Sequence, residues 1–297
     1  MMILLLGSGG QLGRELHLQV AKFFSVYSYQ RIEIDINDTK SLTKVVNSVK
    51  PDVILNAAAY TNVDAAEHDS ERAFMTNAES VKHLAKLANK VGAWLIHYST
   101  DYVFDGVKRT PYSESDYPNP INIYGKSKYF GERAIKNVSE RYIIFRTSWV
   151  IGREGENFAR TILHLAKRQS GIDVVIDQYG VPTSTFLIAR VTIDAIKAIS
   201  DKRSWLRGIY NLVPMGASNR YEMAQTLIAF AEQKGVELQT KVNEIQPILS
   251  ATCESVAQRP QNSLLNNEKL SKCLSFTLPD WEEDFLQVAD QILEDFV

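Results

Sequence analysis

Two kinds of hydrophobic pattern alternate along the first half of the chain. Short, nearly continuous apolar runs predict buried strands at residues 3–6, 52–58, 93–99 and 142–150. Segments in which apolar residues recur every three or four positions predict helices at residues 12–23, 41–49, 67–91 and 124–137. Strands and helices that alternate in this way form a parallel sheet with helices on both faces. We therefore expect an α/β fold with a doubly wound parallel sheet.

The pattern becomes looser after about residue 151. Helices are predicted at residues 157–169, 219–234 and 281–296, and strands at residues 172–177 and 208–213. Ser218 is the expected N-cap of the second of these helices, and Gly235 its expected stop. We expect residues 1–150 to form one domain and residues 151–297 to form mainly a smaller C-terminal α/β domain, interleaved with late strands that return to the first sheet.

Composition and charge exclude several classes of protein. The 297 residues are 45% hydrophobic and carry 33 basic against 35 acidic side chains, which gives a net charge of -2. Neither a disordered chain nor a strongly charged nucleic-acid-binding protein is expected from this composition. The apolar run at the N-terminus is too short to span a membrane. Two cysteines and five scattered histidines predict no protein-bound metal and suit a reducing compartment, so we expect a cytoplasmic protein with no membrane partner.

A glycine-rich loop joins the first predicted strand to the first predicted helix. Gly7, Gly10 and Gly13 are spaced so that the chain can turn tightly, approach a pyrophosphate and pack close to the sheet. The spacing differs from the usual dinucleotide motif because position 12 is leucine. A simple tight turn is the alternative, but the place of the loop favours a Rossmann-type NAD(P)-binding domain at residues 1–150.

The end of the second predicted strand bears on the choice of cofactor. An acidic residue there binds the ribose diol of NAD, whereas a basic residue accommodates the 2′-phosphate of NADP. Residues 26–30 contain no acid, and Arg31 follows. This favours NADPH, with NADH possible; the alternative is that Arg31 is an ordinary solvated charge.

Tyr124 and Lys128 provide the sharpest chemical signal. Residues four apart share one face of a helix, so both side chains project towards one site. A nearby ammonium lowers the pKa of a phenol and makes it a competent proton donor. Thr100, at the end of a predicted strand, could donate a hydrogen bond to a substrate oxygen. The alternative is that these residues only pack or face solvent.

These residues and the motifs around them resemble the extended short-chain dehydrogenase/reductase superfamily and, within it, the dTDP-4-dehydrorhamnose reductase family. The resemblance runs along almost the whole chain, through residues 7–13, 51–59, 99–104, 124–128, 145–149, 177–180, 182–183 and 259–263. It implies that NADPH or NADH reduces the C4 ketone of dTDP-4-dehydro-L-rhamnose to give dTDP-L-rhamnose. It also implies that residues 151–297 mainly bind this substrate.

The resemblance assigns expected roles to individual residues. Tyr124 matches the general acid, Lys128 the ribose-binding residue that tunes it, and Thr100 the residue that orients the carbonyl. The remaining cofactor contacts are expected at the pyrophosphate, the adenine and the nicotinamide half, from Gly7, Gly10, Gln11 and Leu12, from Asp35 and Ile36, and from Ala59, Tyr60 and Thr61. The remaining substrate contacts are expected from Asp101, Trp149 and Arg259.

The chain departs from relatives at two points. Gln30 stands where some relatives carry an acidic residue, which leaves the choice of cofactor open. Some relatives dimerise through magnesium held by glutamates; Glu15 matches one of these, but Phe186 stands at the other position. This argues against a magnesium-bridged dimer and leaves both a monomer and a homodimer open.

Two other functions fit the same scaffold. One is a nucleotide-sugar epimerase or dehydratase, although no acidic residue follows Thr100 and Asp101 where a dehydratase needs it. The other is a non-catalytic regulatory subunit of the same fold, which the presence of Tyr124 and Lys128 disfavours.

Overall fold

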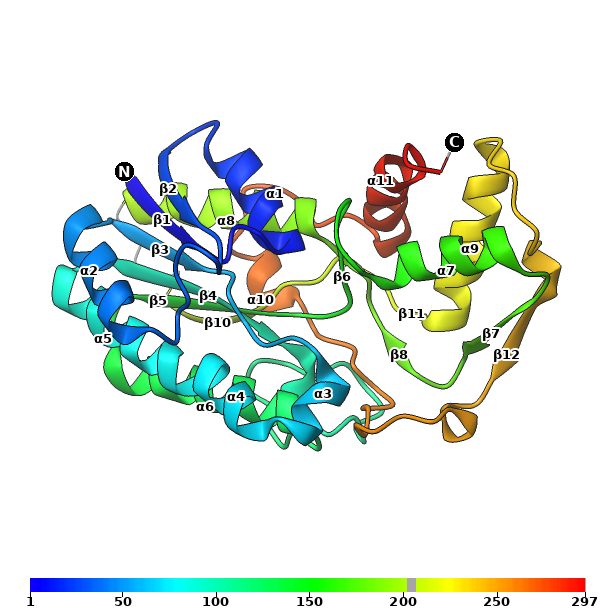
Figure 1. The fold of residues 1–297 in the computed structure, drawn as a ribbon, viewed down its shortest axis with the longest axis horizontal. Coiled ribbons are helices and arrows are strands. Elements are labelled where there is room, and N and C mark those ends of the chain that lie inside the picture. Colours follow the sequence, from blue (N-terminus) through cyan, green and yellow to red (C-terminus); the bar gives the residue numbers. More distant parts are fainter. Residues whose placement is uncertain (202–206, 297) are drawn as a thin grey trace.

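Six parallel strands form the central sheet of the computed structural model, which describes residues 1–201 and 207–296 (Figure 1). Their order is β10-β5-β4-β3-β1-β2. The strands are β1 (Met2–Leu6), β2 (Ser25–Tyr29), β3 (Val53–Asn56), β4 (Trp94–Thr100), β5 (Tyr142–Thr147) and β10 (Gly208–Asn211). From β1 the chain moves outward to β2 and then returns to β3 on the other side of β1. The carboxyl ends of β1 and β3 therefore flank a crevice of the kind that binds ligands in open α/β sheets.

Helices cover both faces of this sheet, which confirms the predicted Rossmann-type doubly wound fold. One face carries α1 (Gln11–Val20) and α8 (Thr185–Ser200), and the other carries α2 (Thr39–Val49), α5 (Ser80–Val91) and α6 (Ile123–Val138) (Figure 1). Alternate residues of β1 enter separate apolar clusters: Ile3 and Leu5 face the first layer, and Leu4 and Leu6 face the second. Burial on both faces explains why the strand sequences are almost continuously apolar.

The segment predicted as one helix at residues 67–91 is divided. It contains the end of α3 (Val63–His68), then α4 (Ser70–Phe74), the π-helical turn η1 (Met75–Glu79) and α5. The side chain of Asp69 accepts a hydrogen bond from the backbone N–H of Arg72, which starts α4 as a new helix. The prediction of a single helix was therefore wrong at its N-terminal end.

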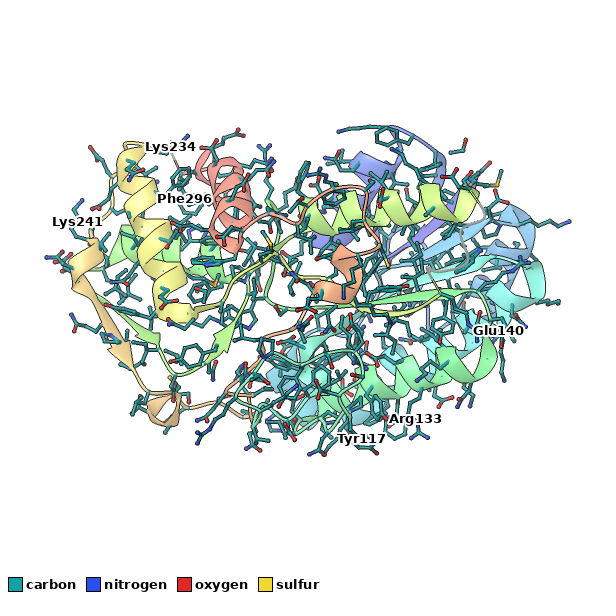
Figure 2. All side chains as sticks on the ribbon, turned by 180° about the vertical axis from the view of Figure 1, so that it is seen from behind. Tyr117, Arg133, Glu140, Lys234, Lys241 and Phe296 are labelled. Atoms are coloured by element: carbon teal, nitrogen blue, oxygen red, sulfur yellow. The ribbon has the colours of Figure 1, made fainter. Side chains whose placement is uncertain are left out.

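A second group of elements has a core of its own and lies beside the sheet. It consists of α7 (Phe158–Arg168), α9 (Arg220–Gln233), α11 (Trp281–Leu293) and the parallel pair β7 (Ile172–Val175) and β12 (Ile245–Ile248). Seen from behind, Lys234, Lys241 and Phe296 mark this group, and Arg133 and Glu140 mark the opposite end (Figure 2). The remaining short elements are β6 (Val150–Ile151), β8 (Tyr179–Gly180), β9 (Thr183–Ser184), β11 (Ser218–Asn219), α10 (Glu268–Ser271), η2 (Asp101–Val103), η4 (Val242–Glu244) and η5 (Ser250–Thr252).

Two further sequence predictions need correction. Asn219, not Ser218, caps α9, because its side chain accepts from the N–H of Glu222, whose own side chain reaches back in a capping box. The run predicted as one strand at residues 142–150 ends at Thr147. Trp149 has a positive φ of 43°, which interrupts the strand before β6 begins.

The chain passes between the two cores more than once. After β9 it returns to cover the sheet with α8 and to add β10 at its edge, and Leu270 and Leu278 also pack in the first core. Between β10 and Leu270 the chain forms α9 of the second core, and its last helix, α11, also packs there. Among the described residues, no helix is both long and apolar enough to cross a membrane.

Candidate active site and its two cavities

The glycine-rich loop leaves no space for side chains where it meets the end of β3. Gly7 has a φ of 82°, and a Cβ at this position would lie 2.6 Å from the backbone nitrogen of Ala58. A Cβ on Gly13 would overlap the carbonyl oxygen of Gly7. Both positions therefore require glycine, and the loop delivers the N-terminus of α1 to the crevice between β1 and β3.

A cavity of about 360 Å³ lies at this crevice. Seven predicted cofactor residues line it: Gly7, Gly10, Arg31, Asp35, Ile36, Ala59 and Tyr60. Gln11, Leu12 and Thr61 are not part of its lining. Gln30, which the sequence analysis singled out for the choice of cofactor, also lines it, whereas three other polar lining residues were not found from the sequence: Asn37, Arg72 and Thr76. We call this space the cofactor cavity.

Two arginines lie at the cofactor cavity. Arg31 is exposed, and its Nε lies 3.6 Å from a carboxylate oxygen of Asp35. Arg72 comes from α4, and its guanidinium lies 5.9 Å from the centre of the Tyr60 ring. Both guanidinium groups are placed where they could bind the 2′-phosphate of NADPH, in line with the cofactor expected from the sequence.

Tyr124 and Lys128 project from the first two turns of α6, which Asn122 caps by accepting the N–H of Gly125. Lys128 is buried, with 2% of its surface exposed, and its Nζ donates to the carbonyl oxygen of Tyr98 at 2.6 Å. Burial lowers the pKa of Lys128 to about 8, although the Glu132 carboxylate raises it in part. Its charge is therefore sensitive to pH near neutrality.

His97 lies behind Lys128 and was not found from the sequence. Its Nε2 is 3.4 Å from Lys128 Nζ, and its Nδ1 is 3.1 Å from the amide nitrogen of Asn56. Burial, and then the charge of Lys128, hold the pKa of His97 well below its usual value, so the ring is neutral. The Asn56 side chain also accepts the N–H of Ala58, which joins Lys128 to the segment after β3 that lines the cofactor cavity. Only the pairing of β3 with β4, which sets Asn56 beside His97, reveals this network.

Tyr124 lies beside Thr100 and Tyr102. Its ring meets that of Tyr102 edge to face, with centroids 5.9 Å apart. Burial raises the pKa of Tyr124, and a hydrogen bond with Thr100 offsets part of the rise. The expected lowering of this pKa by lysine is thus not found: Lys128 points to the Tyr98 carbonyl, and burial dominates. A raised pKa keeps the phenol protonated.

Asp101 follows Thr100 in the buried turn η2. Thr100 Oγ1 donates to Asp101 Oδ1 at 2.9 Å, whereas Asp101 Oδ2 has no hydrogen-bond partner among the described residues. Burial raises the pKa of Asp101 to about 6. Close by, Glu132 binds the guanidinium of Arg146 with both oxygens and accepts from Ser99, which fixes the end of β4 on α6.

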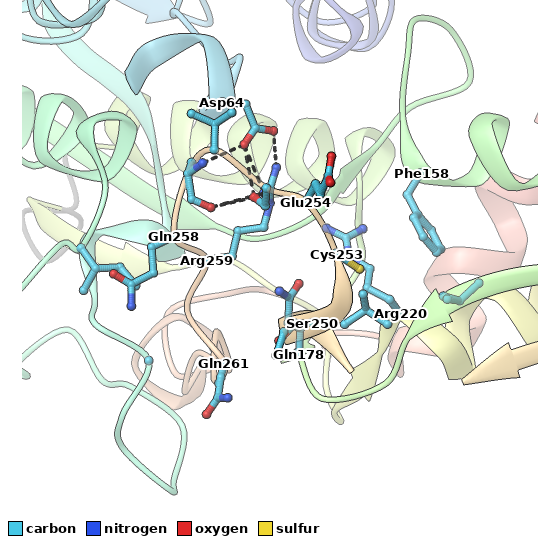
Figure 3. A pocket seen from close by; sticks show the side chains of 18 of the residues that line it. Asp64, Phe158, Gln178, Arg220, Ser250, Cys253, Glu254, Gln258, Arg259 and Gln261 are labelled. Carbon is cyan, nitrogen blue, oxygen red and sulfur yellow. Dashed lines mark hydrogen bonds and ion pairs between the residues drawn. The ribbon is translucent and has the colours of Figure 1, made fainter. Parts of the chain in front are cut away.

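A larger cavity of about 1090 Å³ lies between the sheet and the second group of elements (Figure 3). Arg259, which the resemblance assigns to the substrate, lines it and is paired with Asp64 through bonds of 2.6 and 3.2 Å. Arg220 and Phe158 also line it and were not predicted. We call this space the substrate cavity.

Trp149 does not line the substrate cavity directly but supports it. Its indole lies 4.1 Å from the guanidinium of Arg220, and a Cβ on Gly180 would approach it to 2.6 Å. Asp101 and Tyr102 interact electrostatically with the same guanidinium. The predicted substrate residues Asp101 and Trp149 are therefore brought together around Arg220.

Two sets of interactions lead from the two cavities to residues that lie one helical turn apart on α6. Ala58 lines the cofactor cavity and is bonded to Asn56, which leads through His97 to Lys128. Tyr124, one helical turn from Lys128, meets Tyr102, whose electrostatic neighbours Arg220 and Arg259 line the substrate cavity. Tyr124, Lys128 and Thr100 line neither cavity themselves.

Within residues 1–201 and 207–296, no group of three or more His, Cys, Asp or Glu side chains is placed to hold a metal ion.

Comparison with known proteins gives the family. The family described as RmlD substrate binding domain matches residues 1–294. The dTDP-4-dehydrorhamnose reductase of Escherichia coli (strain K12) is 40% identical over 297 residues, which cover 98% of each chain. Among solved structures, the Bacillus anthracis dTDP-4-dehydrorhamnose reductase in complex with NADP is 31% identical, with a TM-score of 0.88 over 97% of this chain and 98% of that one.

A second solved structure agrees with the first. The dTDP-4-dehydrorhamnose reductase of Clostridium acetobutylicum is 34% identical, with a TM-score of 0.89 over 98% of this chain and 99% of that one. Sequence and fold thus match the same relatives over nearly their full length. The chain is an oxidoreductase and belongs to the RmlD family of dTDP-4-dehydrorhamnose reductases.

Proposed function

We propose that this protein uses NADPH to reduce the C4 ketone of dTDP-4-dehydro-L-rhamnose to dTDP-L-rhamnose. In this proposal Tyr124 donates the proton, Thr100 orients the carbonyl and Lys128 holds the cofactor ribose. The observation that carries it is the position of Lys128 and Tyr124, one helical turn apart on α6 between two cavities. Lys128 leads through His97 and Asn56 to Ala58 at a dinucleotide-type cavity, and Tyr124 meets Tyr102 on the side of a second cavity large enough for a sugar nucleotide.

The residues of the cofactor cavity fit a dinucleotide. Gly7 and Gly13, where a Cβ would overlap neighbouring backbone, would let the backbone come close to a pyrophosphate. The N-terminus of α1 would offer N–H donors to it. Asp35 and Ile36 would flank the adenine, and Ala59, Tyr60 and Thr61 would lie along the nicotinamide half. When bound, NADPH supplies a hydride. The relative from Bacillus anthracis was solved with NADP, and Arg31 and Arg72 would accommodate the 2′-phosphate here.

Tyr124 suits the acid because its phenol keeps its proton. Burial holds its pKa high, and Thr100 lies within hydrogen-bond reach, so one carbonyl oxygen could be met by both hydroxyl groups. As negative charge develops on that oxygen, the phenol O–H transfers its proton to it. Lys128, anchored on the Tyr98 carbonyl and beside His97, has one N–H group left to bind a ribose hydroxyl.

The substrate cavity would receive the sugar nucleotide. Arg259 lines it and offers a planar guanidinium to the diphosphate, while Asp101 and Trp149 lie towards the reacting sugar. We propose the same division along the chain, with residues 1–150 mainly holding the cofactor and residues 151–297 mainly closing over the substrate.

The direct test mixes purified protein with dTDP-4-dehydro-L-rhamnose and either NADPH or NADH. We expect stoichiometric loss of reduced-cofactor absorbance and formation of dTDP-L-rhamnose, identified by mass and NMR. An epimerase would change the sugar without net oxidation of the cofactor, and a regulatory subunit would do neither. Either of these two results would remove the reductase assignment.

A further inference from the structure

The guanidinium of Arg220 is a cationic group of the substrate cavity whose hydrogen-bond donors are unused among the described residues. Within the described residues no hydrogen bond or ion pair joins it to another side chain, and Figure 3 draws dashed lines to Arg259 but none to Arg220. A guanidinium has five N–H donors, which ordinarily find acceptors when they are partly buried. Here the acceptors must come from outside the chain.

The surroundings hold Arg220 in place without neutralising it. Its guanidinium carbon lies 4.1 Å from the centre of the Trp149 ring and 4.8 Å from that of Phe158. Aromatic faces stabilise a cation but accept no conventional hydrogen bond, so the N–H groups stay available. The carboxylate of Asp101 acts on Arg220 only from beyond ion-pair distance.

Arg259 differs from Arg220 in this respect. Asp64 already accepts two hydrogen bonds from its guanidinium, and Ser255 accepts another. Burial lowers the pKa of Arg220, and the neighbouring charge of Arg259 lowers it further, so the two cations face the same space and repel each other. A ligand with two adjacent negative charges would relieve this repulsion.

We propose that Arg220 is a specificity-determining residue that binds the diphosphate of the nucleoside diphosphate sugar. This rests on the proposed function for the identity of the sugar nucleotide. Trp149 and Phe158 preorganise the guanidinium, so little side-chain entropy is lost when the diphosphate binds. With a net charge of -2, the protein as a whole does not attract an anion, and capture depends on such local groups.

The test compares binding of dTDP with binding of thymidine by calorimetry, in the full-length protein and in Arg220→Gln. A hydrogen-bonded charge contributes about 1.5 to 3 kcal/mol, so dTDP affinity should fall about 10- to 100-fold. Thymidine affinity should not change, because it has no phosphate. Arg153→Gln is the matched control: this exposed arginine is paired with Glu294 and should leave both affinities unchanged.

A second variant separates recognition from folding. Arg220→Lys keeps the charge but loses the planar guanidinium, so its dTDP affinity should lie between that of the unchanged protein and that of Arg220→Gln. Unchanged dTDP affinity in both variants, or equal losses for dTDP and thymidine, would overturn the proposal. If dTDP binding depends on Arg220 but the ketone is not reduced, the proposed function fails and this inference stands. If reduction proceeds and Arg220 has no effect on dTDP binding, only this inference fails.

Discussion

The hydroxyl of Tyr124 is the group on which the proposed proton transfer depends. Replacing it with Tyr124→Phe removes the proton donor but keeps the ring that meets Tyr102. General acid catalysis typically contributes about 100- to 10,000-fold, so kcat should fall by that order while NADPH affinity stays nearly the same. Steady-state rates and cofactor fluorescence titration measure the two effects. Tyr129→Phe, on the same helix, should retain full activity; an active Tyr124→Phe would exclude Tyr124 as the acid.

Lys128 should make cofactor binding depend on pH. Burial lowers its pKa to about 8, so the ammonium, which has three N–H donors, gives way to the neutral amine as the pH rises through this value. NADPH affinity should therefore weaken above about pH 8. Lys128→Met should bind NADPH more weakly and show no such step.

Lys126 provides the control for this pH dependence, because it is exposed on the same helix. Lys126→Met should keep the step near the pKa of Lys128. If the step persists in Lys128→Met, another group causes it, and Lys128 does not contact the ribose.

The residues differ in how far sequence alone could find them. The common placement of Tyr124 and Lys128 on one helix could be predicted because residues four apart share a helical face. Arg220 and His97 were missed because no local pattern distinguishes them. Arg220 gains its place from contacts with Trp149 and Phe158, which lie far from it in the chain. Only the folded chain makes these residues neighbours.

At the scale of elements, the strands and amphipathic helices of the sheet were predictable, but α8 was not. Eleven of its sixteen residues are buried, and its polar face is only a narrow stripe of Arg190, Asp194 and Lys197, which gives a weak helical period among so many apolar residues. The end of β5 was missed for a different reason. Trp149 and Val150 suggest from the sequence that the strand continues, and only the positive φ of Trp149 shows that it stops earlier.

The start of α8 should make stability depend on pH. Ser184 caps this helix and donates, from its N–H and its hydroxyl, to both oxygens of Asp284 in α11. Burial raises the pKa of Asp284 to about 6, so its neutral form predominates in the folded protein below that pH. Ser184→Ala removes the cap and a bond to a buried carboxylate, which should cost about 2 to 4 kcal/mol near pH 7.

The cost should be smaller near pH 5. There Asp284 is mostly neutral, and a hydrogen bond to a neutral carboxyl contributes about half as much as one to a carboxylate. Urea unfolding at the two pH values measures the difference. Ser275 binds Asp194 in the same way at an exposed site, so Ser275→Ala is the control, with a small cost at both pH values. An equal cost of Ser184→Ala at both pH values would exclude ionised Asp284 as the cause.

At the scale of the whole molecule, the helix that follows the glycine-rich loop is hydrogen-bonded to the segment at residues 152–154. Gln11 lies at the start of α1, and its side chain accepts the N–H of Gly152 at 3.1 Å. Arg14 in the same helix pairs with Glu154. The loop that would hold the pyrophosphate is therefore fixed to the segment that follows Trp149, so the two cavities are parts of one structure.

The same interleaving predicts that residues 1–150 do not fold alone. This fragment lacks β10, the sixth strand of the sheet, and α8, which covers Ile3, Leu5 and their neighbours in the first core. Without α8 one face of the sheet would expose a large apolar surface to water. We expect the isolated fragment to aggregate or to lack a cooperative unfolding transition and NADPH binding, measured by circular dichroism and titration.

The full chain is the control and should unfold cooperatively and bind NADPH. A fragment 1–150 that did both would show that α8 and β10 are dispensable for the cofactor half. The outcome matters for the proposed division of labour, because α8 and β10 come from residues 185–200 and 208–211, within the half assigned mainly to the substrate. If the fragment fails, the cofactor half includes these later segments, and the division is one of space rather than of sequence.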